Sequence, residues 1–403
     1  MKVIPYGKQY ITDADIEAVV AVLRSDFLTQ GPEIGLFEQE FAAYVGAKYA
    51  VAVANGTAAL HLCTMALNVT PGDSVITTPI TFAASANCVA YCGGEVLFAD
   101  IDPSSYLIDI ESVRKLLVSS QKGTIKGIIP VHFAGNCVNM EALKNLADEF
   151  GVWIIEDACH APGGYFINQA GNKQVVGNGQ FSNCAIFSFH PVKHIATGEG
   201  GMITTNDEAI YKRLCQLRTH GITRVLEDFQ QSPEEVGGDE NYPLWYMEMQ
   251  ELGYNYRLTD FQAALGRSQL KRADQGLEKR KEIADRYATA FQDCDFVHGQ
   301  SGVVGGHAYH LYILEVENRL GLYNFLRTKG IFAQIHYIPC HLMPYYRSKG
   351  WKKGDMPFAE AYYDRCISLP MFPTLTEEEQ DFVIKQVALY YENYEAKRRI
   401  SGF

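Results

Sequence analysis

Short apolar runs alternate along the chain with longer stretches in which apolar residues recur at helical spacing. Runs typical of buried strands lie at residues 49–53, 74–78, 128–131, 152–156 and 183–187. Helical patterns follow the first three of these runs, at residues 57 onward, 82–91 and 139–150. Because parallel strands need crossover connections between them, this alternation predicts a mainly parallel sheet with helices on both faces.

Helical patterns also open the chain. Thr12, with Asp15 three residues later, has the spacing of a helix N-cap, and the pattern continues toward Leu23. A second helix is predicted over residues 33–44, and Gly46 after it supplies the left-handed conformation that closes many helices. The sequence therefore predicts two helices ahead of the first strand.

The last third of the chain mixes the two periodicities. A long helical pattern covers residues 259–293, and strand patterns cover residues 309–315 and 332–336. Thr376 and Glu379 have the spacing of a capping box at the start of a further helix. This region is therefore expected to fold as a smaller α/β unit.

The length of the chain favours two domains. With 403 residues it exceeds the usual size of one hydrophobic core. We expect a large domain, with its N-terminal segment, over residues 1–258, and a connecting helix with a smaller C-terminal domain over residues 259–403. The polar residues 230–241 carry Ser-Pro, Glu-Glu and Gly-Gly pairs, which indicate a surface loop.

Composition and charge exclude several classes of partner. The sequence is 47% hydrophobic and 20% charged, which is typical of a globular protein in water. Its net charge of -12, without a long Lys or Arg run, argues against a nucleic-acid or anionic membrane surface. No apolar stretch approaches the roughly 20 residues of a membrane helix, and residues 1–6 do not resemble a signal peptide. We therefore expect a cytoplasmic protein.

Cysteine and histidine spacing argues against a metal site. The 10 cysteines and 11 histidines are dispersed, and none has zinc-finger or HExxH spacing. We expect no metal, and we interpret the cysteines as reduced core residues. The first predicted strand is followed by Asn55-Gly-Thr57 rather than GxGxxG, which argues against a nucleotide dehydrogenase.

The strongest chemical signal is Lys193. It follows the strand predicted at residues 183–187 and precedes the glycine-rich run Gly198-Glu-Gly-Gly201, where backbone can approach a ligand closely. Asp157 follows the strand predicted at residues 152–156, so both groups lie at carboxyl ends of strands, where open α/β sheets bind ligands. Pyridoxal phosphate (PLP) needs a lysine for a Schiff base, a carboxylate at its ring nitrogen, and hydroxyls or amides at its phosphate. The sequence offers all three and predicts this cofactor.

Five motifs that occur in the expected order resemble the sugar aminotransferases of the DegT/DnrJ/EryC1 family, and the resemblance covers nearly the whole chain. They are Leu28-Thr-Gln-Gly-Pro32, Asn55-Gly-Thr57, Glu156-Asp-Ala-Cys-His160, Ser188-Phe-His-Pro-Val-Lys193 and Gly253-Tyr-Asn-Tyr-Arg257. The resemblance implies an α/β fold of the PLP-dependent aspartate aminotransferase type (fold type I), with a large domain around a mainly parallel sheet and a smaller α/β C-terminal domain. It implies transamination, because members that dehydrate their substrate carry His in place of Lys193.

The family pattern assigns roles to residues near the cofactor ring. Lys193 would be the catalytic lysine, and Asp157 would hold the ring nitrogen. Glu156 competes for the second role, but strand alternation sends the two side chains to opposite faces. His160 lies where the family places Gln or His near the ring hydroxyl, and Phe82 matches an aromatic residue that stacks on the ring. Purely structural roles for Asp157, His160 and Phe82 stay open.

Phosphate has several candidate anchors. Gly56 and Thr57 begin a predicted helix, so their amides and the Thr57 hydroxyl would face an anion at the positive helix end. Thr57 could alternatively serve as the N-cap. Ser188 supplies a hydroxyl near Lys193. The resemblance implies that Asn255 comes from the partner subunit, so that each site is complete only in a homodimer.

A narrower likeness within the family runs through Thr77-Thr-Pro-Ile-Thr-Phe82, His336-Tyr-Ile-Pro339 and Ile367-Ser-Leu-Pro370. It is to members on the pseudaminic acid route, which form UDP-4-amino-4,6-dideoxy-N-acetyl-β-L-altrosamine. It implies amino transfer from L-glutamate to C4 of a UDP-linked 2-acetamido-2,6-dideoxy-4-keto-hexose, the nucleotide-sugar substrate. The alternatives are another nucleotide keto sugar, such as a dTDP-4-keto or 3-keto-6-deoxyhexose or one on the UDP-bacillosamine route, or a noncatalytic regulator. Intact Lys193 and Asp157 argue against the regulator.

By that likeness we expect one set of residues to surround the substrate. Tyr309, His310, His336 and Arg257 are weaker candidates, because such residues are often structural. Arg224 would neutralise a phosphate or a donor carboxylate, although a surface ion pair explains it equally well. The expected substrate-binding residues are Tyr6, Asp26, Phe27, Leu28, Thr29, Arg224 and Tyr337.

Overall fold

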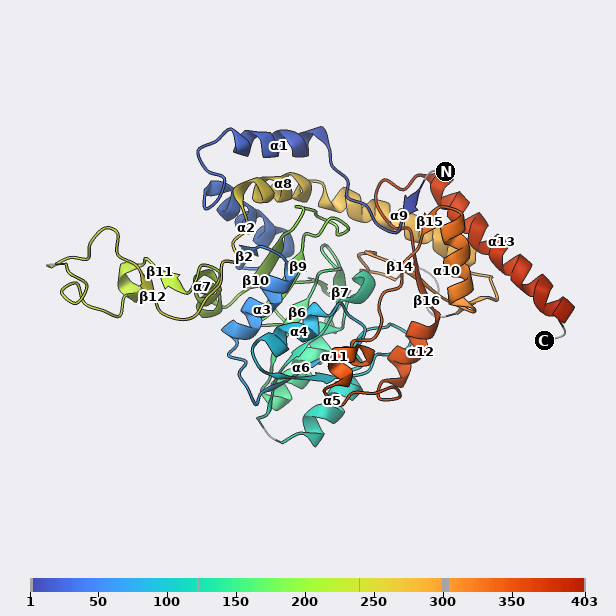
Figure 1. The fold of residues 1–403 in the computed structure, drawn as a ribbon, viewed down its shortest axis with the longest axis horizontal. Coiled ribbons are helices and arrows are strands. Elements are labelled where there is room, and N and C mark those ends of the chain that lie inside the picture. The colour runs from blue at the N-terminus through green and yellow to red at the C-terminus, as the bar shows by residue number, and fades with distance from the viewer. Residues whose placement is uncertain (1–2, 122, 239, 299–303, 402–403) are drawn as a thin grey trace.

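A seven-stranded sheet forms the centre of the computed structural model, which describes residues 3–121, 123–238, 240–298 and 304–401 (Figure 1). Its strand order is β2-β10-β9-β6-β5-β3-β4. The five strands predicted for this sheet all form, with small shifts at their ends. The strands are β2 (Tyr49–Val53), β3 (Ser74–Thr77), β4 (Glu95–Phe98), β5 (Ile125–Ile129), β6 (Trp153–Asp157), β9 (Cys184–Ser188) and β10 (Gly201–Thr205).

One strand of this sheet is reversed. β10 runs antiparallel to both β2 and β9, and the other neighbours pair in parallel. Residues 189–200, all of which the structure describes, join β9 to β10 without a helix. A parallel return would need a longer crossover, so the chain comes back antiparallel. The mainly parallel sheet predicted from the sequence is confirmed, and Lys193 lies in this short connection.

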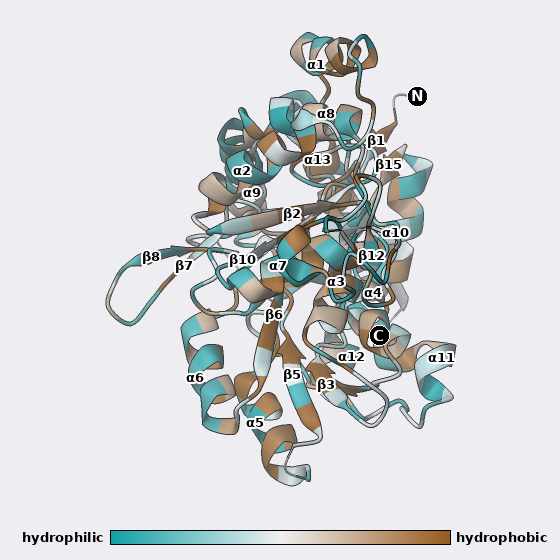
Figure 2. Ribbon diagram, turned by 90° about the vertical axis from the view of Figure 1, so that its left-hand side faces the viewer, coloured by the Kyte–Doolittle hydropathy of each residue, from teal (hydrophilic) through white to brown (hydrophobic). Residues whose placement is uncertain are grey.

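Helices surround the sheet and bury its side chains. α3 packs against β9 and β10, and α6 against β6. In Figure 2, β5 is mostly hydrophobic, whereas α5 and α6 carry both hydrophobic and hydrophilic residues. Buried aliphatic residues such as Leu60, Ile76 and Ile155 fill the core. Burial of each such side chain contributes about 1.5–3 kcal/mol to the free energy of folding. These helices are α3 (Gly56–Ala66), α4 (Ala84–Tyr91), α5 (Ile110–Ser119), α6 (Met140–Phe150) and α7 (Glu208–Leu217).

Both helices predicted at the start of the chain form, as α1 (Asp13–Leu23) and α2 (Pro32–Val45). The Asp15 carboxylate accepts a hydrogen bond from the Thr12 amide at 2.9 Å, which closes the predicted cap. Gly46 ends α2 with φ 81°. Figure 1 shows α1 lying along α8 (Asp260–Leu270) at one edge of the molecule.

The prediction of one continuous helix over residues 259–293 is wrong. The chain forms α8 and then α9 (Ala273–Phe291), separated at Arg272, whose φ of -120° and ψ of 15° are not helical. The guanidinium of Arg272 donates to the Tyr10 carbonyl and to the Asp15 carboxylate, which anchors the break. On one side of this break α8 packs on α1 and α2, and on the other side α9 packs into the C-terminal core.

The C-terminal region has its own hydrophobic cluster, built from residues of α9, α10, α13 and the three-stranded sheet β13-β14-β16. The predicted strand over residues 309–315 starts only at Tyr312, because Tyr309 has φ 46°. The elements are β13 (Val297–His298), β14 (Tyr312–Val316), β16 (Cys366–Leu369), α10 (Arg319–Thr328), α11 (Pro344–Arg347), α12 (Pro357–Arg365) and α13 (Glu377–Ser401).

The N-terminal residues join this region. β1 (Ile4–Pro5) pairs in parallel with β15 (Ile331–Phe332), and Ile4 belongs to the C-terminal cluster. The strand predicted over residues 332–336 forms only as β15, which ends at Phe332, because its partner β1 is equally short. The predicted cap of α13 forms, since Thr376 and Glu379 exchange hydrogen bonds at 3.1 and 3.2 Å. The division into domains at residue 258 stays a prediction.

Between α7 and α8 the chain extends away from the body as an arm (Figure 1, left). The polar residues 230–241 lie there and form neither helix nor strand where the structure describes them, as expected. The arm carries β11 (Ile222–Thr223), η2 (Leu226–Asp228) and β12 (Glu248–Met249).

The remaining short elements lie outside the arm: β7 (Tyr165–Ile167), β8 (Lys173–Val175), η1 (Phe133–Gly135) and η3 (Cys340–Leu342). Within the described ranges, no helix combines the length and apolar character needed to span a membrane.

The buried Asp260 joins α8 to the start of α2. Its carboxylate accepts hydrogen bonds from the amides of Gly31 at 2.8 Å and Glu33 at 3.0 Å. Asp260→Ala leaves both amides without this acceptor, so we expect the free energy of unfolding to fall by about 2–4 kcal/mol. Urea unfolding followed by circular dichroism measures this loss. As a control, Asp364→Ala at an exposed position should change it by less than about 0.5 kcal/mol. Equal stability of the two variants would contradict the prediction.

Candidate active site

One cavity of about 650 Å³ collects most of the residues singled out from the sequence. It opens at the carboxyl ends of β6 and β9, next to the N-terminus of α3, as expected for an open α/β sheet. The predicted residues that line it are Tyr6, Gly56, Thr57, Phe82, Asp157, His160, Ser188, Lys193 and Tyr337, together with the weaker candidates His310 and His336. The other two weaker candidates, Tyr309 and Arg257, do not line it.

Lys193 lies in the connection after β9. Its amide donates to the His190 carbonyl at 2.8 Å, and its Nζ lies 3.3 Å from Nε2 of His310. Burial lowers the pKa of Lys193 to about 8; Arg280 acts in the same direction, and Cys159 and Asp157 oppose it. A lysine with this pKa is partly neutral near pH 7, which is the form that can act as nucleophile or base.

Asp157 is the last residue of β6 and is 5% exposed. Its carboxylate accepts hydrogen bonds from the Ser85 hydroxyl at 2.6 Å and the Cys159 amide at 3.1 Å. These contacts fix the side chain at the cavity wall, where it can face a cationic ring nitrogen. Ser85, on α4, was not singled out from the sequence, because nothing near it in the chain connects it with Asp157.

Glu156 points elsewhere. Its carboxylate accepts from the Ser182 hydroxyl at 2.5 Å and the Gly177 amide at 3.2 Å, and lies 3.1 Å from Nε2 of His132. It does not line the cavity. Strand alternation in β6 therefore separates the two acids as the sequence predicts.

The N-terminus of α3 faces the cavity with close backbone packing. A Cβ on Gly56 would lie 3.1 Å from Cβ of Ser188, and one on Gly201 would lie 2.6 Å from the Asn55 carbonyl carbon. Asn55 caps the helix by accepting from the Ala58 amide at 2.8 Å, so the alternative that Thr57 is the N-cap is wrong. The first amides of a helix lack intrahelical acceptors. Because Ser188 lines the same cavity, these amides and the Ser188 hydroxyl form a candidate anion site.

His160 and Tyr337 form a polar pair at another wall. Nδ1 of His160 accepts from the Ala134 amide at 3.2 Å, and Nε2 lies 3.2 Å from the Tyr337 hydroxyl. Because Nδ1 must be unprotonated to accept, the neutral ring carries its hydrogen on Nε2 and donates to Tyr337. Burial lowers the pKa of His160 and raises that of Tyr337, so both stay uncharged near pH 7. Phe82 lines the same cavity and is 64% exposed.

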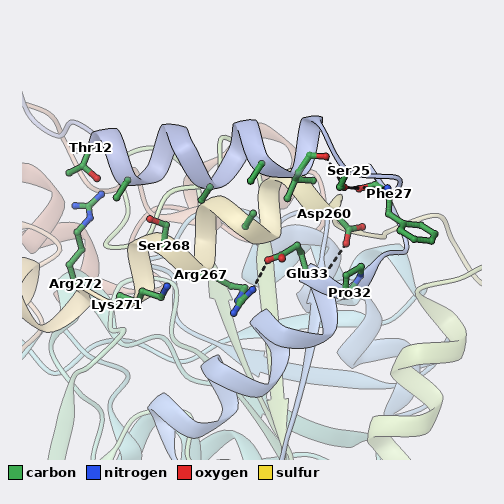
Figure 3. Close-up of a pocket in the computed structure, with 15 residues that line it drawn as sticks. Thr12, Ser25, Phe27, Pro32, Glu33, Asp260, Arg267, Ser268, Lys271 and Arg272 are labelled. Carbon is green, nitrogen blue, oxygen red and sulfur yellow. Dashed lines mark hydrogen bonds and ion pairs between the residues drawn. The ribbon is translucent and has the colours of Figure 1, made fainter.

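Several predicted residues lie away from this cavity within one chain. Asn255 is exposed and forms an isolated antiparallel β-bridge with Thr219. Arg224 lies in the arm near Met247. Phe27 borders a different hollow, between α1 and α8 (Figure 3). Asp26, Leu28 and Thr29, next to Phe27 in the chain, are exposed and do not line the cavity. The roles predicted for these residues stay predictions, and they would require a second chain.

The arrangement fits pyridoxal phosphate. A buried amine, a fixed carboxylate and the amides of a helix N-terminus surround one cavity, and a Cβ on Gly56 would fill space beside Ser188 at that helix end. Among the described residues, no group of three or more His, Cys, Asp or Glu could hold a metal ion. Other lining residues that the sequence did not single out include Asn55, Thr81, Glu199 and Gln334. They come from separate turns, so only the fold brings them together.

Comparison with known proteins agrees with this chemistry. The DegT/DnrJ/EryC1/StrS aminotransferase family matches residues 9–388. The spore coat polysaccharide biosynthesis protein SpsC of Bacillus subtilis is 37% identical over 397 residues, which cover 95% of this chain and 96% of that protein.

Solved structures show the same fold. PseC of Helicobacter pylori, an aminotransferase involved in the biosynthesis of pseudoaminic acid, has a TM-score of 0.85 and 28% identity, covering 97% of this chain and 100% of that one. Spr1654 of Streptococcus pneumoniae, solved in its PLP form, gives 0.85 and 28%, covering 97% and 99%. The chain belongs to the DegT/DnrJ/EryC1/StrS aminotransferase family and is a PLP-dependent sugar aminotransferase that acts on a nucleotide sugar.

Proposed function

We propose that this enzyme transfers an amino group from L-glutamate to C4 of a UDP-linked 2-acetamido-2,6-dideoxy-4-keto-hexose, forming UDP-4-amino-4,6-dideoxy-N-acetyl-β-L-altrosamine. The observation that carries the reaction class is the meeting of Lys193 and Asp157 in one cavity. The likeness to PseC over nearly the whole of both chains supports the choice of sugar.

In this proposal Lys193 and Asp157 act on different atoms of the cofactor. PLP, when bound, supplies the electron sink that makes a carbon-bound proton removable. Lys193 attaches the cofactor and, once free, holds and moves that proton, a task suited to an amine with a pKa of about 8. Asp157, held by Ser85, keeps the ring nitrogen protonated.

In this proposal different cavity residues bind the phosphate and the sugar. Gly56, Thr57 and Ser188 bind the phosphate, which places the reacting end of the cofactor toward Lys193. Tyr6 and Tyr337 line the side from which the sugar approaches, and their rings and hydroxyls suit a pyranose.

We further propose a homodimer with shared sites. Asn255 lies outside the cavity of its own chain, on an exposed segment next to the arm, and the family resemblance assigns it to the phosphate of the partner's site. Arg224 and residues 26–29 are likewise exposed, so in this proposal they act on substrate only across a dimer interface.

A second candidate is amination of a different nucleotide keto sugar. SpsC, a spore coat polysaccharide biosynthesis protein, shares 37% identity with this chain, compared with 28% for PseC. The cofactor residues are compatible with either product, because sugar choice depends on the walls around C4 rather than on Lys193 or Asp157.

The role of Lys193 predicts a specific chemical label. Borohydride reduction of the PLP-loaded protein should fix the cofactor to the peptide that contains Lys193, as read by mass spectrometry. Lys193→Ala should lose this label and reduce turnover by roughly 10³-fold or more, because both the attachment point and the base are gone. Lys212→Ala, at an exposed lysine paired with Glu208, is the control and should keep both. A label on any other lysine would refute the assignment.

The two neighbouring acids should behave differently. Asp157→Asn removes the charge that stabilises the protonated ring, so kcat should fall roughly 10²-fold or more. Glu156→Gln should leave kcat of the folded protein close to the parent value but lower its thermal stability, because its carboxylate binds Ser182 and Gly177 outside the cavity. Steady-state kinetics and thermal melts on both variants separate the roles. The reverse pattern would assign the ring nitrogen to Glu156.

Shared sites predict complementation between two inactive chains. A Lys193→Ala chain still supplies Asn255, and an Asn255→Ala chain still supplies Lys193. Mixing them in equal amounts and allowing exchange should restore about a quarter of the parent activity, since half of the dimers are mixed and each has one intact site. In the control, parent chains are mixed with a chain that carries both substitutions. Its mixed dimers contain no intact site, so they add no activity. If complementary mixing also gives none, each site is contained within one chain.

The substrate is tested with a pair of sugars that differ in nucleotide. We expect kcat/KM for the UDP-linked 4-keto sugar to exceed that for its dTDP counterpart by roughly tenfold or more. Mass spectrometry and NMR of the product should place the new amine at C4. Equal use of the dTDP sugar, or amination at C3, would favour the second candidate function.

A further inference from the structure

His310 is the polar neighbour of the Lys193 amine on the side of the C-terminal region. Its Nε2 lies 3.3 Å from Nζ of Lys193, and the residue is 3% exposed. It precedes β14, far along the sequence from Lys193. The contact therefore exists only because the C-terminal region packs against the connection between β9 and β10.

The backbone around His310 is held from several directions. Arg280 of α9, itself 1% exposed, donates to the carbonyls of both Tyr309 and His310 at 3.2 Å. The amides on either side, of Ala308 and Leu311, donate to the carbonyls of Gly135 and Ala134 at 2.8 and 3.1 Å. The backbone that carries the imidazole is thus held in place next to Lys193.

Gly135 makes this approach possible. A Cβ at Gly135 would lie 2.7 Å from the Tyr309 amide nitrogen and 3.0 Å from that of His310, and its φ of 100° already favours glycine. Close packing of two backbones brings the imidazole to the cavity wall.

The protonation of His310 follows from its surroundings. Burial, and after it the nearby Lys193, lowers the pKa of His310, so the ring is neutral near pH 7. The cationic or titratable groups that face it are Lys193, His160, Arg280 and His194. A neutral Nε2 can accept a hydrogen from the Lys193 amine, whereas a second cation would repel it.

The other ring nitrogen supports a role beyond packing. Nδ1 of His310 is buried and has no hydrogen-bond partner among the described residues. Leaving a buried polar atom unsatisfied costs about 1–3 kcal/mol, a cost that an aliphatic side chain would avoid. An imidazole is therefore a poor choice for this position if packing were its only task.

We infer that His310 is a positioning residue for Lys193: by accepting one hydrogen of the amine, it directs the nitrogen lone pair into the cavity. This inference rests on the proposed attachment of the cofactor to Lys193. His310 acts through the lysine and does not itself bind the cofactor. An amine free to rotate would present its lone pair correctly only part of the time.

The first test measures covalent attachment rather than turnover. Chains freed of cofactor are mixed with PLP, and the C=N bond that forms at Nζ with loss of one water is followed by absorbance and borohydride trapping. His310→Leu should slow attachment roughly tenfold, the effect of one lost hydrogen bond. His310→Gln should recover most of the rate, because the glutamine side chain is long enough to place its amide oxygen near the position of Nε2. His310→Asn, which is polar but shorter, should stay slow and serves if the leucine variant does not fold.

Two further measurements separate this role from the alternatives. In a Lys193→Ala background, adding His310→Leu should leave the dissociation constant of PLP unchanged within about twofold, because His310 then has no amine to position. His341→Leu removes another fully buried histidine, outside the cavity, and controls for lost stability; its attachment rate should match the parent's.

The outcomes distinguish this inference from the proposed function. Attachment at the parent rate in both His310→Leu and His310→Asn overturns the inference alone. A weaker affinity for PLP in the Lys193→Ala background also overturns it, since His310 would then contact the cofactor directly. A parent chain that attaches no cofactor at Lys193 overturns the proposed function, and this inference with it.

Discussion

The burial of the Lys193 amine is the constraint on which the rest of this structure depends. A buried lysine loses its proton more easily, and here burial lowers the pKa of Lys193 to about 8. Asp157 opposes that shift, so the amine is neither fully charged nor inert. This balance requires burial of the amine beside one fixed carboxylate, and a protein can build it only where several elements converge. The family's chemistry follows from that environment, because lysine and aspartate alone are common surface residues.

The sheet provides the convergence. β6 and β9 are parallel neighbours, so Asp157 and Ser188 end at the same edge. The reversed strand β10 keeps the connection that carries Lys193 short, and it brings Gly201 against Asn55 at the start of α3. The amine, the acid and the anion site thereby come from three turns at one sheet edge. The C-terminal region completes the cavity with His310 and Tyr337.

The similarity to relatives extends over nearly the whole chain, although most residues differ. SpsC and PseC match this chain over nearly its whole length, although only 37% and 28% of the residues are identical. The TM-score of 0.85 at 28% identity shows that PseC has the same fold although most side chains differ. Part of the cavity wall, including Ile335, His336 and Tyr337, comes from the C-terminal region, outside the central sheet. We therefore expect reaction class and substrate choice to depend on different parts of the molecule.

The sequence by itself determined the alternation of strands and helices, the caps at Thr12 and Thr376, and the placement of Lys193 and Asp157 after two strands. These are local features, set by periodicity and by residues close in the chain. Tertiary structure decided what depends on distant contacts. It broke the helix predicted over residues 259–293 at Arg272, and it reversed β10. It set Ser85 against Asp157 and His310 against Lys193, contacts that no local pattern encodes because the partners are far apart in sequence.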